Sequence, residues 1–597
     1  MLLSSCTFSE IAKSLQSADL AALPVLRIAI LRNIMLEPLV TYLRYAAWQL
    51  GLNAQVSVGE FDTIMQEALA ASPTLYDHDT AVILLFQHLE GISWDLARNF
   101  NALSEERVQA EVERVSNQCS QIIHALRGNS SAMIVWHGFL PPIDPALGIF
   151  DDQTSHGQGS TVHRLNQTVR QTISTVANAY YIDMGRLMAR VGAKHFFDAR
   201  NWHLWRAPFT LAAYAEIVQE ECKYIRARVG KNKKCLVLDC DNTLWGGIVG
   251  EEGVAGIKLG LVAPGSVYRE LQQQILELYH RGIILALCSK NNEESVFEVL
   301  DQHPECVLKR QHLSAWRINW QDKPSNIREL ANELNIGLDS MVFMDDSPFE
   351  IELVRQALPE VAVIHFTRER LYQIRQLLAS SGLFDTLTVS QEDRSRGRML
   401  RAEAERRQLQ SASTDLNSYY HSMAMQLVIR FADANSVARV AQLTQKTNQF
   451  NLTTRRYSDA DIHQFVQADD SEVIHVQLLD KFGDFGIVGV CILKHAPEQT
   501  VIDTFLLSCR ALSRGVEDVL LLQALRLAKM RGATRVSGVF YPTRKNSQTE
   551  FFYPRSGFDA APPLDSEQAR HFVFSLDKEL PQAPPFFAAI VSDIDAL

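Results

Sequence analysis

The stretch "CLVLDCDNTLWGG" places Asp239, Cys240 and Asp241 directly after an apolar run. Residues 235–238 have the character of a buried strand. In an open α/β sheet, ligands bind beyond the carboxyl ends of the strands, so both carboxylates are expected at a ligand-binding edge. Two carboxylates this close repel each other unless a cation or a shared proton relieves them, and Mg²⁺ prefers oxygen ligands. The pair therefore predicts a magnesium site.

A second strand-like run, "SMVFMDD", also ends in two acids, Asp345 and Asp346. A third, "IILALCS", ends in the hydroxyl of Ser289, and Lys323 lies in the segment "WQDKPSN". An isolated Asp-x-Asp is most simply a turn or a helix cap. The second acid pair, the hydroxyl and the lysine together favour a catalytic role instead.

These residue types fit phosphoryl transfer through a covalent intermediate. Asp239 would attack phosphorus, and Asp241 would protonate the leaving oxygen and then activate water. Mg²⁺, Lys323 and Ser289 would neutralise the phosphoryl oxygens. The predicted metal ligands are Asp239, Asp241, Asp345 and Asp346, and the predicted phosphate-binding residues are Thr243, Ser289, Lys290, Asn291 and Lys323.

The same motifs resemble the haloacid dehalogenase-like (HAD) superfamily, whose DxDxT motif corresponds to residues 239–243. The longer stretch "LDCDNTLWGGIVGEEG" resembles the FkbH-like branch. Members of that branch divert 1,3-bisphosphoglycerate into glyceryl thioesters on acyl carrier protein for polyketide-type biosynthesis. The resemblance implies a bifunctional glyceryltransferase and phosphatase that uses Mg²⁺ and a phosphopantetheine arm supplied by the carrier protein.

Two other functions stay open on the sequence alone. The chain could be a Mg²⁺-dependent small-molecule phosphatase whose C-terminal domain only shapes the substrate site. It could also be a nonenzymatic scaffold, although the set of acids, hydroxyl and lysine argues against that role. Thioester formation would distinguish the transferase from the simple phosphatase. Dependence of phosphate turnover on a divalent metal would distinguish an enzyme from the nonenzymatic scaffold.

Two thiols are candidates for carrying an acyl group. Cys240 lies beside the nucleophile, where a thiolate could attack an acyl phosphate, but cysteine also suits a buried core position. Cys509, in "FLLSCRALSRGVEDVLL", precedes Arg510 and Arg514 near the expected start of a helix. This segment also resembles the FkbH-like pattern. Positive charge and a helix N-terminus could lower the thiol pKa or bind an anionic phosphopantetheine group. The sequence does not choose between the thiols.

Length and patterning predict a multidomain α/β protein. The chain has 597 residues, 47% hydrophobic and 21% charged, which is more than one core usually organises. Apolar runs alternating with helix-like segments predict parallel sheets in 1–225 and in 226–389, the latter a HAD-like Rossmannoid sheet. Antiparallel strands followed by a helix predict an α+β domain in 390–597. The charged run 390–410 is expected to be a connecting helix.

The two outer domains resemble known folds without their usual motifs. The N-terminal region resembles an SGNH hydrolase-like module, but Arg32 and Asn33 stand where its nucleophilic serine is expected, so we predict no hydrolysis. Asp198 and His203 would then serve packing or hydrogen bonding. The C-terminal region resembles a GNAT-like acyltransferase fold, with "FFYPRSGF" at 551–558. It lacks the glycine-rich acetyl-CoA loop, so a carrier arm is expected rather than acetyl-CoA.

Charge and cysteine usage set the expected surroundings. A net charge of −11 argues against nucleic acid as a partner, and no window offers roughly 20 uninterrupted apolar residues. The nine scattered cysteines show no disulfide or zinc spacing. We therefore expect a cytoplasmic protein with no membrane contact. The FkbH-like resemblance implies that its partners are 1,3-bisphosphoglycerate and an acyl carrier protein.

Overall fold

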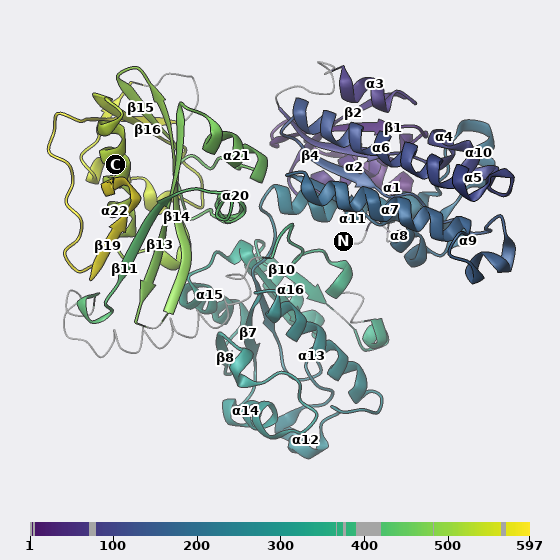
Figure 1. Ribbon diagram of the computed structural model, residues 1–597. Helices are drawn as coiled ribbons and strands as arrows, with labels where there is room; N and C mark the ends of the chain where they lie inside the picture. The colour runs from purple at the N-terminus through teal and green to yellow at the C-terminus, as the bar shows by residue number, and fades with distance from the viewer. Residues whose placement is uncertain are drawn as a thin grey trace. The chain divides into compact units, whose positions relative to one another are not determined.

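The computed structural model describes the chain except for residues 1–2, 4–5, 71–78, 366, 374–377, 390–419, 482, 563–568 and 597. The chain divides into two compact units, residues 1–228 and 229–597 (Figure 1). The expected connecting helix at 390–410 lies outside the described residues. Among the described helices, none is long and apolar enough to cross a membrane.

The first unit is built on a five-stranded parallel sheet of order β2-β1-β3-β4-β5. Its central strands are almost continuously buried, which explains why their sequences are apolar runs without alternation. Its strands are β1 Val25–Arg32, β2 Asn53–Phe61, β3 Thr80–Phe86, β4 Met133–His137 and β5 Ala179–Ile182. Its helices are α1 Phe8–Ser17, α2 Glu37–Gln49, α3 Ile64–Leu69, α4 Leu89–Ile92, α5 Trp94–Arg98, α6 Glu105–Asn129, α7 Gln158–Thr175, α8 Met184–Val191, α9 Ala193–Phe196, α10 Ala199–Trp205 and α11 Leu211–Arg228.

The second unit begins with another five-stranded parallel sheet, of order β10-β9-β6-β7-β8. Apolar clusters cover both faces of this sheet, and the parallel sheets predicted for both regions are confirmed. Its strands are β6 Cys235–Leu238, β7 Ile284–Ser289, β8 Ala315–Ile318, β9 Met341–Asp345 and β10 Ala362–His365. Its helices are α12 Val249–Gly256, α13 Gly265–His280, α14 Glu293–Gln302, α15 Lys323–Leu334 and α16 Pro348–Ala357.

The remainder of the second unit is a mostly antiparallel sheet of order β17-β18-β16-β15-β14-β13-β11-β19, with α22 packed against it. Antiparallel strands followed by a helix were predicted here, and the structure confirms them. The strands are β11 Gln426–Phe431, β12 Phe450–Asn451, β13 Ser471–Asp480, β14 Gly483–Ala496, β15 Gln499–Leu507, β16 Arg535–Phe540, β17 Asp559–Ala561, β18 Arg570–Ser575 and β19 Ala589–Ser592. The helices are α20 Val437–Lys446, α21 Asp459–Gln467, α22 Val516–Met530 and α23 Phe552–Arg555.

The strands β15 and β16 pair in parallel only over their first four residues. Beyond Ile502, residues 450–452 lie between the diverging chain segments. Strand β12 pairs with the end of β15, the Leu452 amide donates to the Phe505 carbonyl at 3.1 Å, and the Tyr541 amide donates to the Leu452 carbonyl at 2.9 Å. Residues 450–452 therefore satisfy backbone groups that diverging strands would otherwise expose.

Candidate active site

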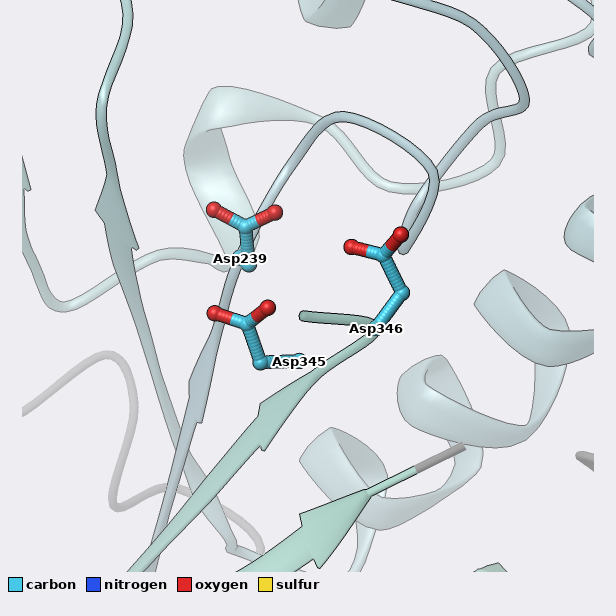
Figure 2. Close-up of side chains that lie close together, drawn as sticks. All are labelled: Asp239, Asp345 and Asp346. Atoms are coloured by element: carbon cyan, nitrogen blue, oxygen red, sulfur yellow. The ribbon is translucent and has the colours of Figure 1, made fainter. Parts of the chain in front are cut away.

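Three carboxyl groups gather at the carboxyl edge of the second parallel sheet (Figure 2). Asp239 directly follows β6, Asp345 is the last residue of β9, and Asp346 comes next. Because β6 and β9 are adjacent parallel strands, their ends coincide. One carboxylate oxygen of each acid lies within 4.8 Å of those of the other two. The sequence prediction that the two acidic strand ends meet is therefore realised in the fold.

Lys323 provides the positive charge inside this group. It is the first residue of α15, whose N-cap Asp322 accepts a hydrogen bond from the Ser325 amide. Its ammonium donates to Asp239 Oδ1 at 2.8 Å and to Asp345 Oδ2 at 2.5 Å. Burial by itself would lower the pKa of Lys323, but the two carboxylates outweigh it and the pKa is raised. Lys323 therefore stays charged and holds the two acids together.

The two buried acids of the cluster, Asp239 and Asp345, carry more negative charge than Lys323 can balance. Burial first, and then the nearby charge of Asp239, raise the pKa of Asp345 to about 7. The two buried carboxylates, Asp239 and Asp345, and one ammonium would leave a net charge of about −1 in the pocket, which is costly without another cation. The donor set consists of carboxylate oxygens, which suit a hard divalent cation such as Mg²⁺.

The structure turns the Asp241 carboxylate away from the three-acid cluster. Its Oδ1 accepts from Trp245 Nε1 at 2.8 Å and from the Val249 amide at 3.1 Å, and its Oδ2 accepts from Asn291 Nδ2 at 2.8 Å. These donors hold both oxygens, so Asp241 is not part of the three-acid cluster, and its predicted role as a metal ligand stays a prediction. Burial is the main cause that raises the pKa of Asp241, which favours a proton-donor role.

The other predicted phosphate-binding residues of this sheet differ in their burial and in their hydrogen-bond partners. Ser289 ends β7 and is buried, and Thr243 is fully buried with a hydroxyl that has no partner among the described residues. Lys290 forms an ion pair with Glu350 at 2.8 Å instead of joining the acids. Asn291 reaches Asp241, as described above. The sequence reasoning missed Trp245 as a site residue, although its position four residues after Asp241 could have suggested the contact.

The two candidate thiols differ sharply in their surroundings. Cys240 is completely buried, and burial followed by the charge of Asp239 raises its pKa well above the ordinary value for a thiol. A buried, protonated thiol is a poor nucleophile. Cys509 is only half-buried and lies at the start of a short 3₁₀ turn after β15. Geometry therefore favours Cys509 as the reactive thiol.

Cys509 lines a cavity of about 630 Å³ within the second unit. Arg510 and Arg514, the predicted anion-binding residues, also line it, and Arg514 lies over the ring of Phe485. The cavity lining includes seven basic residues and two acidic ones, Asp339 and Glu360. The basic residues are Lys234, Arg439, Lys446, Arg510, Arg514, Arg544 and Lys545. The cavity is suited to an anionic ligand.

In the first unit, the residues considered for hydrolysis have structural contacts. Asp198 is the N-cap of α10 and accepts hydrogen bonds from the Asn201 amide and side chain. His203 is exposed on the same helix. The Asn33 side chain accepts from the His88 amide and donates to the His88 carbonyl. The Asn33 contacts join two distant segments, and the Asp198 contacts cap the start of α10.

Comparison with known families places the acid cluster in a phosphatase domain. Residues 234–387 match the model of the NLI interacting factor-like phosphatase family. That range contains β6 to β10 and every member of the cluster described above. The second unit therefore includes a phosphatase domain of the HAD-like type. A search of curated proteins found no match.

A solved structure extends the likeness beyond this domain. The chain is similar to the N-terminal part of the protein BF1531 from Bacteroides fragilis, a crystal structure containing a phosphatase domain complexed with Mg. The two are 27% identical, the match covers 64% of this chain and 100% of that chain, and the TM-score is 0.58.

Acetyltransferases give much weaker structural matches. A putative acetyltransferase of the GNAT family from Desulfovibrio desulfuricans is 14% identical, with a TM-score of 0.22, over 25% of this chain and 99% of that chain. The ribosomal-protein-S18-alanine N-acetyltransferase from Escherichia coli is 12% identical, with a TM-score of 0.20, over 27% of this chain and 97% of that chain.

Proposed function

We propose that this chain is a bifunctional enzyme that combines Mg²⁺-dependent phosphatase chemistry at Asp239 with glyceryl transfer through Cys509. The substrate would be 1,3-bisphosphoglycerate, and the acceptor would be the phosphopantetheine thiol of an acyl carrier protein. The observation that carries the phosphatase half is the cluster of Asp239, Asp345 and Asp346, in which the Lys323 ammonium bonds to the two buried acids, Asp239 and Asp345.

In the phosphatase half, Asp239 attacks phosphorus and the ester oxygen leaves. Lys323 orients Asp239 through its Oδ1 and neutralises charge that develops on the phosphoryl group. Asp241, positioned by Trp245 and Asn291, gives its proton to the leaving oxygen and later takes one from water. Asp239, Asp345 and Asp346 would hold Mg²⁺, which supplies charge neutralisation of the phosphoryl oxygens when bound.

In the transfer half, the Cys509 thiolate attacks the acyl phosphate carbonyl. The half-buried position of Cys509, beside a cavity with seven basic side chains, supports this role and an anionic carrier arm. The complete burial of Cys240 speaks against the rival thiol. Acetyl-CoA is a poor candidate ligand for the space between β15 and β16, because residues 450–452 already bond there to β15 and to Tyr541, the residue that follows β16.

Intact-mass measurement of the protein mixed with 1,3-bisphosphoglycerate and Mg²⁺ tests this function. An acyl adduct should appear on Cys509, be absent from Cys509→Ser, and persist in Cys6→Ser as the matched control. Asp239→Asn should still form the adduct but release no phosphate from phosphomonoesters. Absence of any adduct in protein that hydrolyses phosphomonoesters would overturn the transferase half.

A phosphatase without acyl transfer is the second candidate. The observation that favours it is the family match, which is confined to residues 234–387 and excludes Cys509. Turnover of phosphate with no thioester on protein or acceptor would establish that function.

A further inference from the structure

A buried carboxylate, Asp503, lies within β15. Its position is a β-bulge, because Leu493 of β14 faces Ile502 and Ile492 faces Thr504, which leaves Asp503 between the two pairs. The pairing of β15 with β16 also ends at Ile502. A bulge re-aims a side chain and is typical of strands beside functional sites. The Asp503 side chain is only 1% exposed, so its charge requires partners within the fold.

Four side chains satisfy this carboxylate, two on each oxygen. Arg455 donates to Oδ1, and the Lys494 ammonium lies 3.0 Å from the same oxygen. Oδ2 accepts from the Tyr457 hydroxyl at 2.6 Å and from the Thr504 hydroxyl at 3.1 Å. None of these residues lines the basic cavity described above. Asp503 is therefore the centre of a separate polar cluster.

This cluster holds one positive charge more than its carboxylate balances. Arg455 and Lys494 share Asp503, and no second acid contacts either cation among the described residues. Burial by itself would lower the pKa of Arg455, but the charge of Asp503 outweighs it and the pKa is raised. The guanidinium therefore stays charged. Both cationic side chains are 45% exposed, so an anion from solution can reach them.

The contact between Arg455 and Asp503 leaves donors for a ligand. It uses Nη1 alone, whereas a guanidinium can donate to a carboxylate through two parallel bonds. The second bond is blocked, because the hydroxyls of Tyr457 and Thr504 occupy Oδ2. A guanidinium on one side and an ammonium on the other suit a phosphate group, whose oxygens can accept from both directions, better than a planar carboxylate.

The loop that carries Arg455 is held at both ends. At its start, the Asn451 side chain accepts from the Thr454 amide at 2.8 Å. At its end, the Thr444 hydroxyl accepts from the Tyr457 amide at 3.0 Å. The guanidinium therefore starts from a fixed backbone, and a ligand does not have to order the loop in order to bind.

Lys494 is held from the other side of the cluster. It lies on the same face of β14 as Val490 and Ile492, which pack under α20 and α21 (Figure 1). Its ammonium lies 4.9 Å from the centre of the Phe465 ring of α21, a distance typical of a cation–π contact. This face is opposite the one that α22 covers.

We propose that Arg455 and Lys494, positioned by Asp503 and Tyr457, form a binding subsite for a phosphate group, separate from the acid cluster and from the basic cavity. Two reactants of the proposed function carry such a group, the acyl phosphate substrate and the carrier arm, and the choice of phosphate rests on that function. Asp503 is a positioning residue, because both of its oxygens are engaged within the cluster.

Modification of arginine by phenylglyoxal tests this subsite in the full-length protein. Peptide mass analysis gives the reaction rate separately for Arg455 and for Arg535, an exposed residue of β16. The probes are 3-phosphoglycerate and phosphopantetheine, with glycerate and pantetheine as their phosphate-free counterparts, at equal ionic strength. At about ten times its dissociation constant, a bound phosphate probe should slow the reaction of Arg455 about tenfold and leave Arg535 unchanged.

The two phosphate probes distinguish the two sources of the ligand. Protection by 3-phosphoglycerate supports the subsite and assigns it to the acyl substrate, whereas protection by phosphopantetheine supports it and assigns it to the carrier arm. A structural ion pair gains no protection from either probe. If no probe protected Arg455 more than Arg535, the subsite would be overturned. Equal protection by glycerate or pantetheine would overturn the assignment to phosphate.

Lys494→Gln removes one cation and keeps Arg455 for the readout. Loss of one charged hydrogen bond should weaken binding about tenfold or more, so the protection should fall to about twofold or less at the same probe concentration. Lys529→Gln, which replaces an exposed lysine of α22, is the matched control and should keep full protection. Full protection in Lys494→Gln would overturn the part assigned to Lys494.

The protection and the adduct on Cys509 are independent measurements. Protection of Arg455 in protein that forms no adduct would overturn the transferase function and leave the phosphate subsite standing. An adduct on Cys509 without protection of Arg455 would overturn the subsite and leave the transferase function standing.

Discussion

Lys323 is the residue on which the charge balance of the acid cluster depends. Its ammonium contacts two buried carboxylates, Asp239 and Asp345. Lys323→Met keeps the length of the side chain but leaves the carboxylates without their partner. We expect phosphate release from p-nitrophenyl phosphate to fall by about 10²–10³-fold, the range seen when a group that stabilises developing charge is removed. Steady-state kinetics with saturating Mg²⁺ measure this loss.

Lys13→Met is the matched control for this substitution, because Lys13 is exposed on α1. It should retain the activity of the unmodified protein. If Lys323→Met kept its rate within about threefold of that control, Lys323 would have no part in stabilising the phosphoryl group.

His475 on β13 should make the C-terminal sheet sensitive to acid. Burial is the main cause that lowers its pKa to about 4, from an ordinary value of 6.5. The unfolded chain therefore binds a proton more readily than the folded one, so stability is full above about pH 6.5 and is lost as the pH falls toward 4. At pH 5 we expect a loss of about 2 kcal/mol relative to pH 7.

Hydrogen exchange of the β13 and β14 amides at pH 7 and pH 5 measures this loss. In His475→Gln, the loss of stability between pH 7 and pH 5 should be smaller by about 2 kcal/mol. Burial also lowers the pKa of His88 to about 4, but His88 lies in the other unit and is present in both the unmodified protein and the His475→Gln variant. An equal pH dependence in both proteins would rule His475 out as the source.

At the scale of elements, sequence patterns predict those features that a single strand determines. The apolar runs before Asp239 and Asp345 predicted buried parallel strands, and parallel strands bring their carboxyl ends together. The direction of the Asp241 side chain was not predictable, because it depends on how the loop after β6 brings Trp245 and the Val249 amide to its oxygens. Loop closure of that kind has no periodic signature.

Contacts between distant segments were equally hidden from sequence patterns. The two-residue strand β12 is too short to show alternation, yet it fills the gap beside β15. The location of Cys509 beside Asn335 joins residues 174 positions apart. Local sequence could indicate that Cys509 follows a strand, but only the tertiary fold shows which edge of the phosphatase sheet it meets.

The turn that follows β16 depends on one buried amide. Asn546 is fully buried, accepts from the Thr543 amide at 2.7 Å, and donates to the carbonyls of Asn451 and Tyr541 at 2.9 Å each. Asn546→Ala leaves these buried groups unpaired and should cost about 2–4 kcal/mol of unfolding free energy. Urea unfolding followed by far-ultraviolet circular dichroism measures the change.

The neighbouring Gln548→Ala serves as the control for the turn. Gln548 is exposed and its side chain makes one long hydrogen bond, at 3.3 Å, to the Gln449 carbonyl. Its removal should change stability by no more than about 0.5 kcal/mol. Equal stabilities for the two variants would show that the buried bonds of Asn546 do not hold the turn between β16 and the cavity.

At the scale of the whole molecule, the charge of the cavity opposes the charge of the chain. The net charge of the protein is −11, whereas the cavity around Cys509 has seven basic residues against two acidic ones. The net negative charge of the protein repels a distant anion, whereas the basic residues of the cavity attract an anion that has reached it. The sign of a salt effect therefore shows which of the two charge distributions a carrier arm meets.

Discharge of phosphoglyceryl-Cys509 by phosphopantetheine and by pantetheine makes this comparison, since the two acceptors differ only in the phosphate. At low ionic strength we expect phosphopantetheine to react about tenfold faster, because the basic cavity concentrates the anion. Raising the salt from about 0.05 M to 0.5 M shortens the screening length to a few ångströms, so the ratio of the two rates should fall toward one. Stopped-flow quenching and mass analysis give both rates. A ratio that starts below one and rises with salt would mean that the acceptor responds to the net negative charge, and the carrier arm would then have to enter by a route that avoids the basic cavity.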